Sequence, residues 1–176
     1  MEDNKPAIAA IIHGSNDAAD SLLAEFARHL RSQGWLVAGV IKEDTAPRKS
    51  CAREMVLVDL EDETRYIISQ DLGPASISCR VDPRGVAAAS VALRRGLAAG
   101  ADLVVANRFG ELEATGGGFS AEMLELMANG VPLLTVVVEK YLEDWRRFTG
   151  NAGTELPPQR DAVDAWFASL QDEAAR

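Results

Sequence analysis

The first residues with chemical potential lie in the segment HGSNDAADS near the N-terminus. Gly14 and Ser21 have the spacing of the first glycine and the metal-binding hydroxyl in the phosphate-loop pattern GxxxxGK[ST], and Ser15 lies between them. Two positions depart from this pattern, because Ala19 replaces the second glycine and Asp20 replaces the lysine. A carboxylate close to a phosphate costs about 1–4 kcal/mol near a surface. The segment therefore predicts a ligand loop that does not support ordinary Mg-ATP hydrolysis.

A second group of residues follows the apolar run DLVVA, in the segment NRFGELEATGGG. Phosphate-loop enzymes usually end this strand with an Asp that holds Mg²⁺, whereas this chain has Asn107 and Arg108. One hypothesis is a charge exchange across the crevice, in which Asp20 pairs with Arg108. Alternatively, the Arg108 guanidinium and backbone amides of the TGGG turn bind a common anion. A third interpretation pairs Arg108 with Glu111 or Glu113 and gives it no ligand role.

The third group lies in ISQDLGPASISCRVD, a short polar segment that contains Gly73. Loops of this kind often carry function. Gln70 and Asp71 offer hydrogen bonds to a sugar or a base, or they simply end a strand. Cys79 beside Arg80 is either a thiol with a lowered pKa or a buried, inert cysteine.

Alternating strands and helices must position these three segments. Strands are predicted over 7–12 and 35–41, in DLVVAN and in PLLTVVV, and helices follow the first, third and fourth of them. The first two strands and the helix between them form a βαβ unit with a right-handed crossover. MVLVDL and RYIISQ flank an acidic turn and predict a hairpin. Asp82 and Pro83 begin a helix, and helical stretches around 141–148 and 162–170 end the chain.

This pattern predicts one three-layer α/β domain over residues 1–176, with a mainly parallel sheet and an inserted β-hairpin. In such a sheet the ligand crevice lies beyond the carboxyl ends of the strands, where the three polar segments begin. His13 also ends a strand and could contact a ligand there, but we interpret it as a hydrogen-bonded loop residue. Tyr141, Trp145, Phe148 and Trp166 have nearly helical spacing and are interpreted as packing against the sheet.

Composition excludes several other classes of protein. The 176 residues are 47% hydrophobic, which favours a folded core over intrinsic disorder. A net charge of −9 argues against nucleic acid or a membrane surface as a partner. Cys51 and Cys79 lack C-x-x-C spacing, so neither a disulfide framework nor a metal site is expected. The N-terminal apolar run is too short for a signal peptide or a membrane span, and we expect a cytoplasmic protein.

Several motifs together resemble one bacterial family. SQDLG, CRVDP, NRFGELEA with its glycine turn, and YLEDWRRF resemble the domain-of-unknown-function family 2478, which is often encoded near molybdate transport genes. That family is similar to small phosphate-loop nucleoside-triphosphatases, in which the strand ends in Asp-Glu-x-Gly and a Glu follows. Asn107, Arg108, Gly110 and Glu113 occupy the corresponding positions here. The resemblance implies a degenerate P-loop NTPase-like fold and a nucleotide or oxyanion ligand.

We therefore predict a cytoplasmic binding or regulatory protein that holds a molybdate-like oxyanion or a nucleotide. Arg80 and Arg108 would recognise charge. Gly14, Gly116 and Gly118 would let the backbone approach the ligand. The remaining predicted ligand-binding residues are Ser15, Asp20, Ser21, Gln70, Asp71, Gly73, Cys79, Asn107, Gly110 and Glu113.

Two alternatives from other classes remain at this point. The first is a nucleoside-triphosphatase with a non-standard phosphate loop, in which Ser21 or Glu113 assists a metal and Asp71 or Glu113 orients water. The second is a non-catalytic interaction domain that uses its C-terminal aromatic helices, which leaves a homo-oligomer open.

Overall fold

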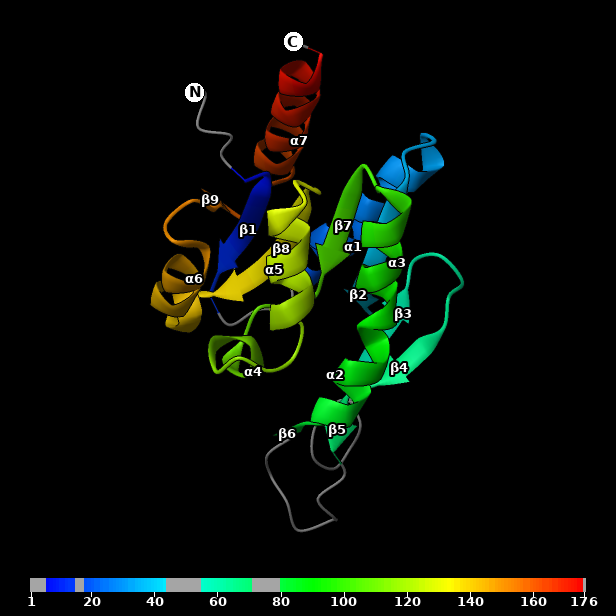
Figure 1. Ribbon diagram of the computed structural model, residues 1–176, viewed down its shortest axis with the longest axis vertical. Coiled ribbons are helices and arrows are strands. Elements are labelled where there is room, and N and C mark those ends of the chain that lie inside the picture. Colours follow the sequence, from blue (N-terminus) through cyan, green and yellow to red (C-terminus); the bar gives the residue numbers. More distant parts are fainter. Residues whose placement is uncertain (1–5, 15–17, 44–54, 71–79, 176) are drawn as a thin grey trace.

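A seven-stranded sheet forms the centre of the molecule (Figure 1). The computed structural model describes residues 6–14, 18–43, 55–70 and 80–175. The strand order is β4-β3-β2-β7-β8-β1-β9, in which β3 and β4 form an antiparallel hairpin and the other strands are parallel. The strands of this sheet are β1 (Ile8–His13), β2 (Val37–Lys42), β3 (Val56–Asp59), β4 (Arg65–Ile67), β7 (Leu103–Ala106), β8 (Leu133–Val138) and β9 (Thr154–Leu156), and β5 (Ser69–Gln70) pairs with β6 (Arg80–Val81) in a separate sheet.

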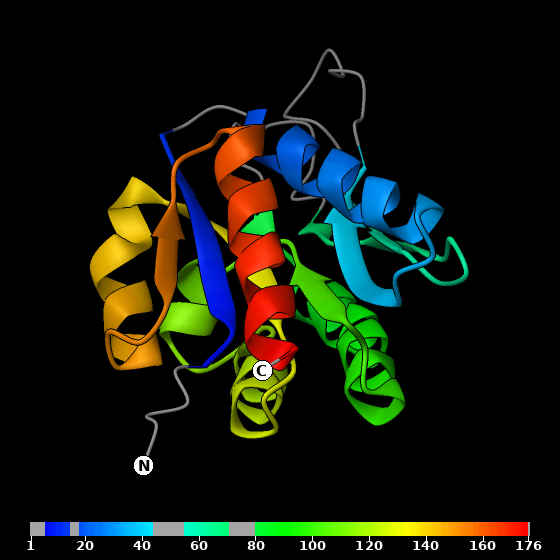
Figure 2. The same ribbon diagram turned by 90° about the horizontal axis from the view of Figure 1, so that it is seen from above.

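Helices cover both faces of this sheet (Figure 1, Figure 2). On one face, Leu23 and Phe26 of α1 and Val163 of α7 pack with Ile11 and Val136 of the sheet. On the other face, side chains of α2, α3, α5 and α6 pack with the opposite side of the same strands. The helices are α1 (Ala18–Ser32), α2 (Pro83–Ala89), α3 (Val91–Ala99), α4 (Glu111–Ala114), α5 (Ser120–Ala128), the 3₁₀ turn η1 (Glu139–Tyr141), α6 (Leu142–Thr149) and α7 (Arg160–Ala174).

The three-layer α/β architecture with an inserted hairpin is therefore confirmed. The strands β7 and β8 read as continuous apolar runs because helices bury both of their faces. The hairpin of β3 and β4 forms around the acidic turn, as the sequence predicts. Asp82 caps α2 by accepting a hydrogen bond from the backbone N–H of Arg84 at 3.0 Å. Trp145 and Trp166 are buried, which agrees with their interpretation as packing residues.

The strand order, which the sequence left open, places the apolar strands β7 and β8 between the parallel strands β1 and β2. Two details of the sequence-based topology are wrong. The segment 154–156 is a strand and not part of a connection between helices, since the outer edge of β1 offers it backbone partners. The helix that starts after Asp82 breaks at Ser90, whose hydroxyl donates to the carbonyl of Ala87 at 2.6 Å; such local bonds bend helices. The interpretation of His13 as a hydrogen-bonded residue is also wrong, because both of its ring nitrogens are buried without a hydrogen-bond partner among the described residues.

Candidate functional site

The carboxyl ends of the parallel strands bring two of the three predicted segments together. His13 ends β1, Lys42 ends β2 and Asn107 follows β7, so all three lie at one edge of the sheet. The third segment is described only at residues 68–70 and 80–82, where Gln70 of β5 pairs with Arg80 of β6 and where Ile68 and Val81 line a pocket. The predicted ligand residues Ser15, Asp71, Gly73 and Cys79 lie outside the described residues, as does Cys51.

Asp20 joins the first segment to the second, but through other partners than predicted. Its carboxylate is 7% exposed and accepts a hydrogen bond from the side-chain amide of Asn107 at 2.7 Å. The ammonium of Lys42 lies 3.4 Å from the other carboxylate oxygen. The predicted pair between Asp20 and Arg108 is therefore replaced by a pair with Lys42. The reason is topological, because β2 and β7 are adjacent, and Lys42 and Asn107 at their ends both contact Asp20 of α1.

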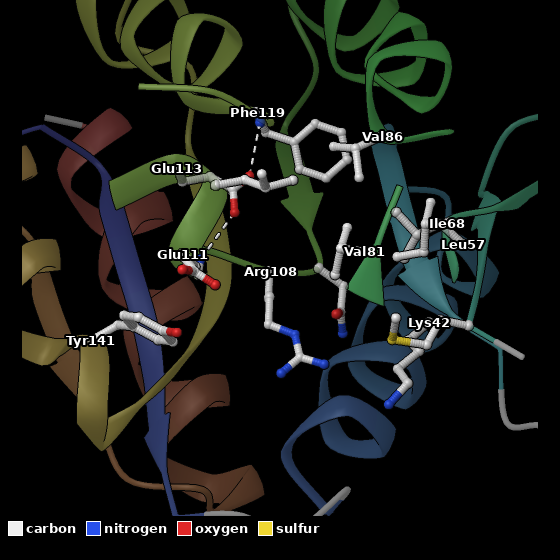
Figure 3. A pocket seen from close by; sticks show the side chains of 14 residues that line it. Lys42, Leu57, Ile68, Val81, Val86, Arg108, Glu111, Glu113, Phe119 and Tyr141 are labelled. Atoms are coloured by element: carbon white, nitrogen blue, oxygen red, sulfur yellow. Dashed lines mark hydrogen bonds between the residues drawn. The ribbon is translucent and has the colours of Figure 1, made fainter. Parts of the chain in front are cut away.

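Arg108 points instead into a pocket that Lys42 and Asn107 also line (Figure 3). The pocket has a volume of about 640 Å³. Within the part of the chain that the structure describes, the half-buried Arg108 guanidinium has no hydrogen bond or ion pair. The peptide bond between Asn107 and Arg108 is cis. The third interpretation of Arg108, as the ion-pair partner of Glu111 or Glu113, is therefore not what the structure shows.

The pocket has an apolar wall and a polar rim. Side chains of the hairpin, of α2 and of the start of α5 form the apolar wall, and residues at the ends of β2, β7 and β8 contribute polar groups (Figure 3). A concave site of this composition suits an organic ligand with a few polar anchors. The wall is made mainly by Leu57, Ile68, Val81, Val86, Leu112 and Phe119, and the polar groups belong to Lys42, Asn107, Arg108, Glu111, Glu113 and Tyr141.

Glu113 connects the start of α4 to the glycine turn (Figure 3). One carboxylate oxygen accepts from the backbone N–H of Gly110 and the other from that of Phe119, each at 3.0 Å. The side chain is buried, and this burial raises the pKa of Glu113, while the two amides and the positive charge of Arg108 oppose the shift. Glu113 thus helps to shape the pocket by holding the backbone at Gly110 and Phe119.

The raised pKa of Glu113 predicts a pH-dependent contribution to stability. The folded protein keeps a proton on this carboxyl at pH values where the unfolded chain has lost it, so stability falls as pH rises from about 4 through the folded-state pKa. The unfolding free energy of the wild type minus that of Glu113→Gln should therefore decrease over this window. Urea denaturation of both proteins between pH 4 and pH 8 measures the difference, and a constant or increasing value would contradict the assignment.

The remaining predicted residues lie around this site without lining the pocket. Gly14 is exposed directly after β1, and Ser21 is exposed in the first turn of α1. In the glycine turn, the N–H groups of Gly116 and Gly117 donate to the carbonyls of Glu113 and Leu112. These two amides therefore already have acceptors within the turn. Gly118 leaves the space that the Glu113 side chain occupies, because a Cβ atom at this position would overlap the Glu113 carboxylate.

Sequence reasoning missed Lys42 and Tyr141 as pocket residues. Lys42 is the last residue of β2, and Tyr141 lies in the turn that comes after β8. The rule that selected Asn107, namely to inspect the residues at and just beyond the end of each parallel strand, also selects both of these residues. The apolar wall carries no such signal, because Leu57, Val86 and Phe119 have the burial of ordinary core residues.

The described residues contain neither a cluster of metal ligands nor a membrane-spanning helix. No group of three or more His, Cys, Asp or Glu side chains in 6–14, 18–43, 55–70 and 80–175 could hold a metal ion. In the same ranges, no helix is both long and apolar enough to cross a membrane.

One known protein is similar to this chain in sequence, and one known structure is similar in fold. The chain is 36% identical over 169 residues to the molybdenum import ATP-binding protein ModC 2 of Bradyrhizobium diazoefficiens. That alignment covers 96% of this chain but only 19% of ModC 2. The crystal structure of THEP1 from the hyperthermophile Aquifex aeolicus is similar with a TM-score of 0.64 and 14% sequence identity, over 93% of this chain and 96% of the THEP1 chain.

The likeness to THEP1 shows that the fold is P-loop NTPase-like, as the resemblance implied. A family model matches residues 8–166, which include every element that lines the pocket. The chain therefore belongs to the family described as protein of unknown function (DUF2478).

Proposed function

We propose that the protein binds an anionic ligand, either a molybdate-like oxyanion or the phosphate of a nucleotide, at the carboxyl edge of the sheet. One observation carries the proposal: Arg108 presents a guanidinium to the pocket without a hydrogen bond or ion pair from any described residue. A guanidinium offers planar paired donors that fit tetrahedral oxyanions and phosphates. The charge of Lys42 at the same rim is largely offset by Asp20.

The environment of Asp20 favours binding over hydrolysis. Asp20 occupies the position of the lysine in the phosphate-loop pattern. Its buried carboxylate accepts a hydrogen bond from Asn107, which occupies the position of the Asp that usually ends this strand. The usual lysine and Mg²⁺ couple is therefore replaced by a hydrogen-bonded Asp–Asn pair. On this basis we infer a degenerate phosphate loop that holds an anion without Mg²⁺-dependent catalysis.

Two observations favour different ligands within this proposal. The likeness to ModC 2 supports a link to molybdenum metabolism, with the chain acting as a cytoplasmic binding or regulatory unit. The apolar wall supports a nucleotide, because a bare oxyanion has no group to place against Leu57, Val86 and Phe119. Both ligands would place their negative charge at Arg108.

A thermal-shift screen tests the proposal and separates its alternatives. Molybdate, tungstate, phosphate, sulfate, ATP and GTP are each added with and without Mg²⁺. A ligand at 100 times its Kd that binds only the folded state stabilises by about 2.7 kcal/mol, which gives a readily measured rise in Tm. We expect stabilisation without Mg²⁺. Stabilisation only with Mg²⁺ and a nucleotide, together with phosphate release, would instead indicate a nucleoside-triphosphatase, and no response would favour an interaction domain.

A further inference from the structure

The pocket that Arg108 lines is much larger than a bare oxyanion needs. Its volume is about 640 Å³, whereas a water molecule takes up about 30 Å³ in the liquid. An ion of four oxygens around one central atom therefore fills only a small part of this space. Apolar pockets of about 300–1,000 Å³ are typical of organic ligands. The space beyond the guanidinium is thus sufficient for an organic group.

The apolar wall of this pocket presents hydrocarbon to solvent. Val81 of β6 is 38% exposed although it lines the pocket, and Leu112 of α4 is only partly buried. The Arg108 side chain extends between Tyr141 and Val81 in Figure 3. A ligand can therefore place an uncharged ring system on the wall, where apolar surface is removed from water, while its charged group reaches Arg108.

The charged side chains of the pocket favour a ligand with one anionic group. Of the two described cations that line it, Lys42 is already paired with Asp20, which leaves Arg108. The carboxylate of Glu111 is exposed at the same rim and has no hydrogen bond or ion pair with a described residue. A chain of three phosphates brings more negative charge towards Glu111 and Asp20, and like charges repel.

We propose that the ligand is a phosphate monoester of an uncharged ring system, the chemical class to which nucleoside monophosphates belong. Its phosphate accepts hydrogen bonds from Arg108, and its ring lies against Leu57, Val81 and Val86. This inference rests on the proposed function and narrows the ligand of that same site. A bare oxyanion lacks the ring and a triphosphate carries excess charge, so both bind at Arg108 more weakly than the monoester.

Titration calorimetry in the presence of EDTA tests the ligand class. AMP, GMP, CMP and UMP are compared with their nucleosides, their triphosphates and inorganic phosphate. We expect at least one monophosphate to bind about tenfold or more tightly than its own nucleoside, its own triphosphate and inorganic phosphate. The nucleoside loses the charged hydrogen bonds, and inorganic phosphate loses the apolar contact.

The variant Val81→Asn tests the apolar wall without a change of charge. It should weaken binding of that monophosphate about 3- to 6-fold and leave the affinity for inorganic phosphate unchanged, because only the ring contacts the wall. Ile67→Asn is the matched control, since Ile67 is 55% exposed on the edge strand β4 and does not line the pocket. The control should change neither affinity, and urea denaturation checks that both variants are folded.

The outcomes separate this inference from the proposed function. If a triphosphate or inorganic phosphate binds as tightly as every monophosphate, or if Val81→Asn weakens inorganic phosphate and the monophosphate equally, the inference is overturned. The proposed function still stands in those cases when the binding is lost in Arg108→Gln. If none of these probes, nor molybdate, binds in a way that depends on Arg108, both the inference and the proposed function fail.

Discussion

The variant Gly118→Ala is expected to be destabilised by about 3 kcal/mol or more. The backbone of Gly118 has φ of +56°, in the left-handed region that costs a residue with a Cβ about 1–2 kcal/mol. A Cβ atom there would also lie 1.6 Å from Oε2 of Glu113. The carboxylate would have to leave its backbone donors, and hydrogen bonds to a charged group are worth about 1.5–3 kcal/mol each.

Gly116→Ala is the matched control, because Gly116 also has a positive φ, of +89°, but a Cβ atom there meets nothing within 4 Å. Its cost should be limited to the backbone term of about 1–2 kcal/mol. Urea denaturation of both variants measures the difference. In the double variant Gly118→Ala with Glu113→Ala, the overlap is removed, so the two effects should be less than additive. Equal losses for Gly116→Ala and Gly118→Ala would show that Glu113 is not held as described.

The variant Arg108→Gln is expected to lose most of the affinity for anions while keeping its stability. The side chain has no hydrogen bond or ion pair with any described residue, so its removal leaves no buried partner unsatisfied. A lost charged hydrogen bond to the ligand weakens binding by roughly 10- to 100-fold. Titration calorimetry measures the affinity, and urea denaturation measures the stability.

Arg147→Gln is the control for a general effect of charge. Arg147 is exposed on α6, with a side chain that is 77% accessible, and it does not line the pocket. Removal of either arginine changes the net charge equally, so a purely long-range effect would weaken binding similarly in both variants. Similar affinities for Arg108→Gln and Arg147→Gln would therefore refute the assignment of Arg108.

Much of the fold could be predicted because parallel strands buried on both faces leave a strong sequence signal. The apolar runs of β1, β2, β7 and β8, the acidic hairpin turn and the cap at Asp82 are all local patterns. The order of the strands, in contrast, depends on contacts between residues that are far apart in the sequence. The apolar pattern of β1 suits pairing with either β2 or β8, and only the completed packing selects β8. The short strand β9 depends entirely on the edge that β1 offers.

For the candidate site as well, the sequence predicted the local positions of residues but not which of them contact one another. The residues at and just beyond the ends of the parallel strands include Asn107 and Arg108, and the same pattern indicates that Asp20 lies near them. The pattern does not determine which charged side chains form ion pairs with one another. That choice depends on the adjacency of β2 and β7, which places Lys42 beside Asp20 and leaves Arg108 for the pocket. The two hydrogen bonds that Glu113 accepts from backbone N–H groups also could not be predicted, because they depend on how the glycine turn closes over α4.

Calorimetric titration of molybdate and of ATP into the wild type and Arg108→Gln, in the presence of EDTA, tests the central claim most directly. The account predicts that at least one of these ligands binds the wild type without a divalent metal, and that Arg108→Gln weakens this binding by at least about tenfold. Equal binding by both proteins, or binding that appears only when Mg²⁺ is restored and is accompanied by phosphate release, would contradict it.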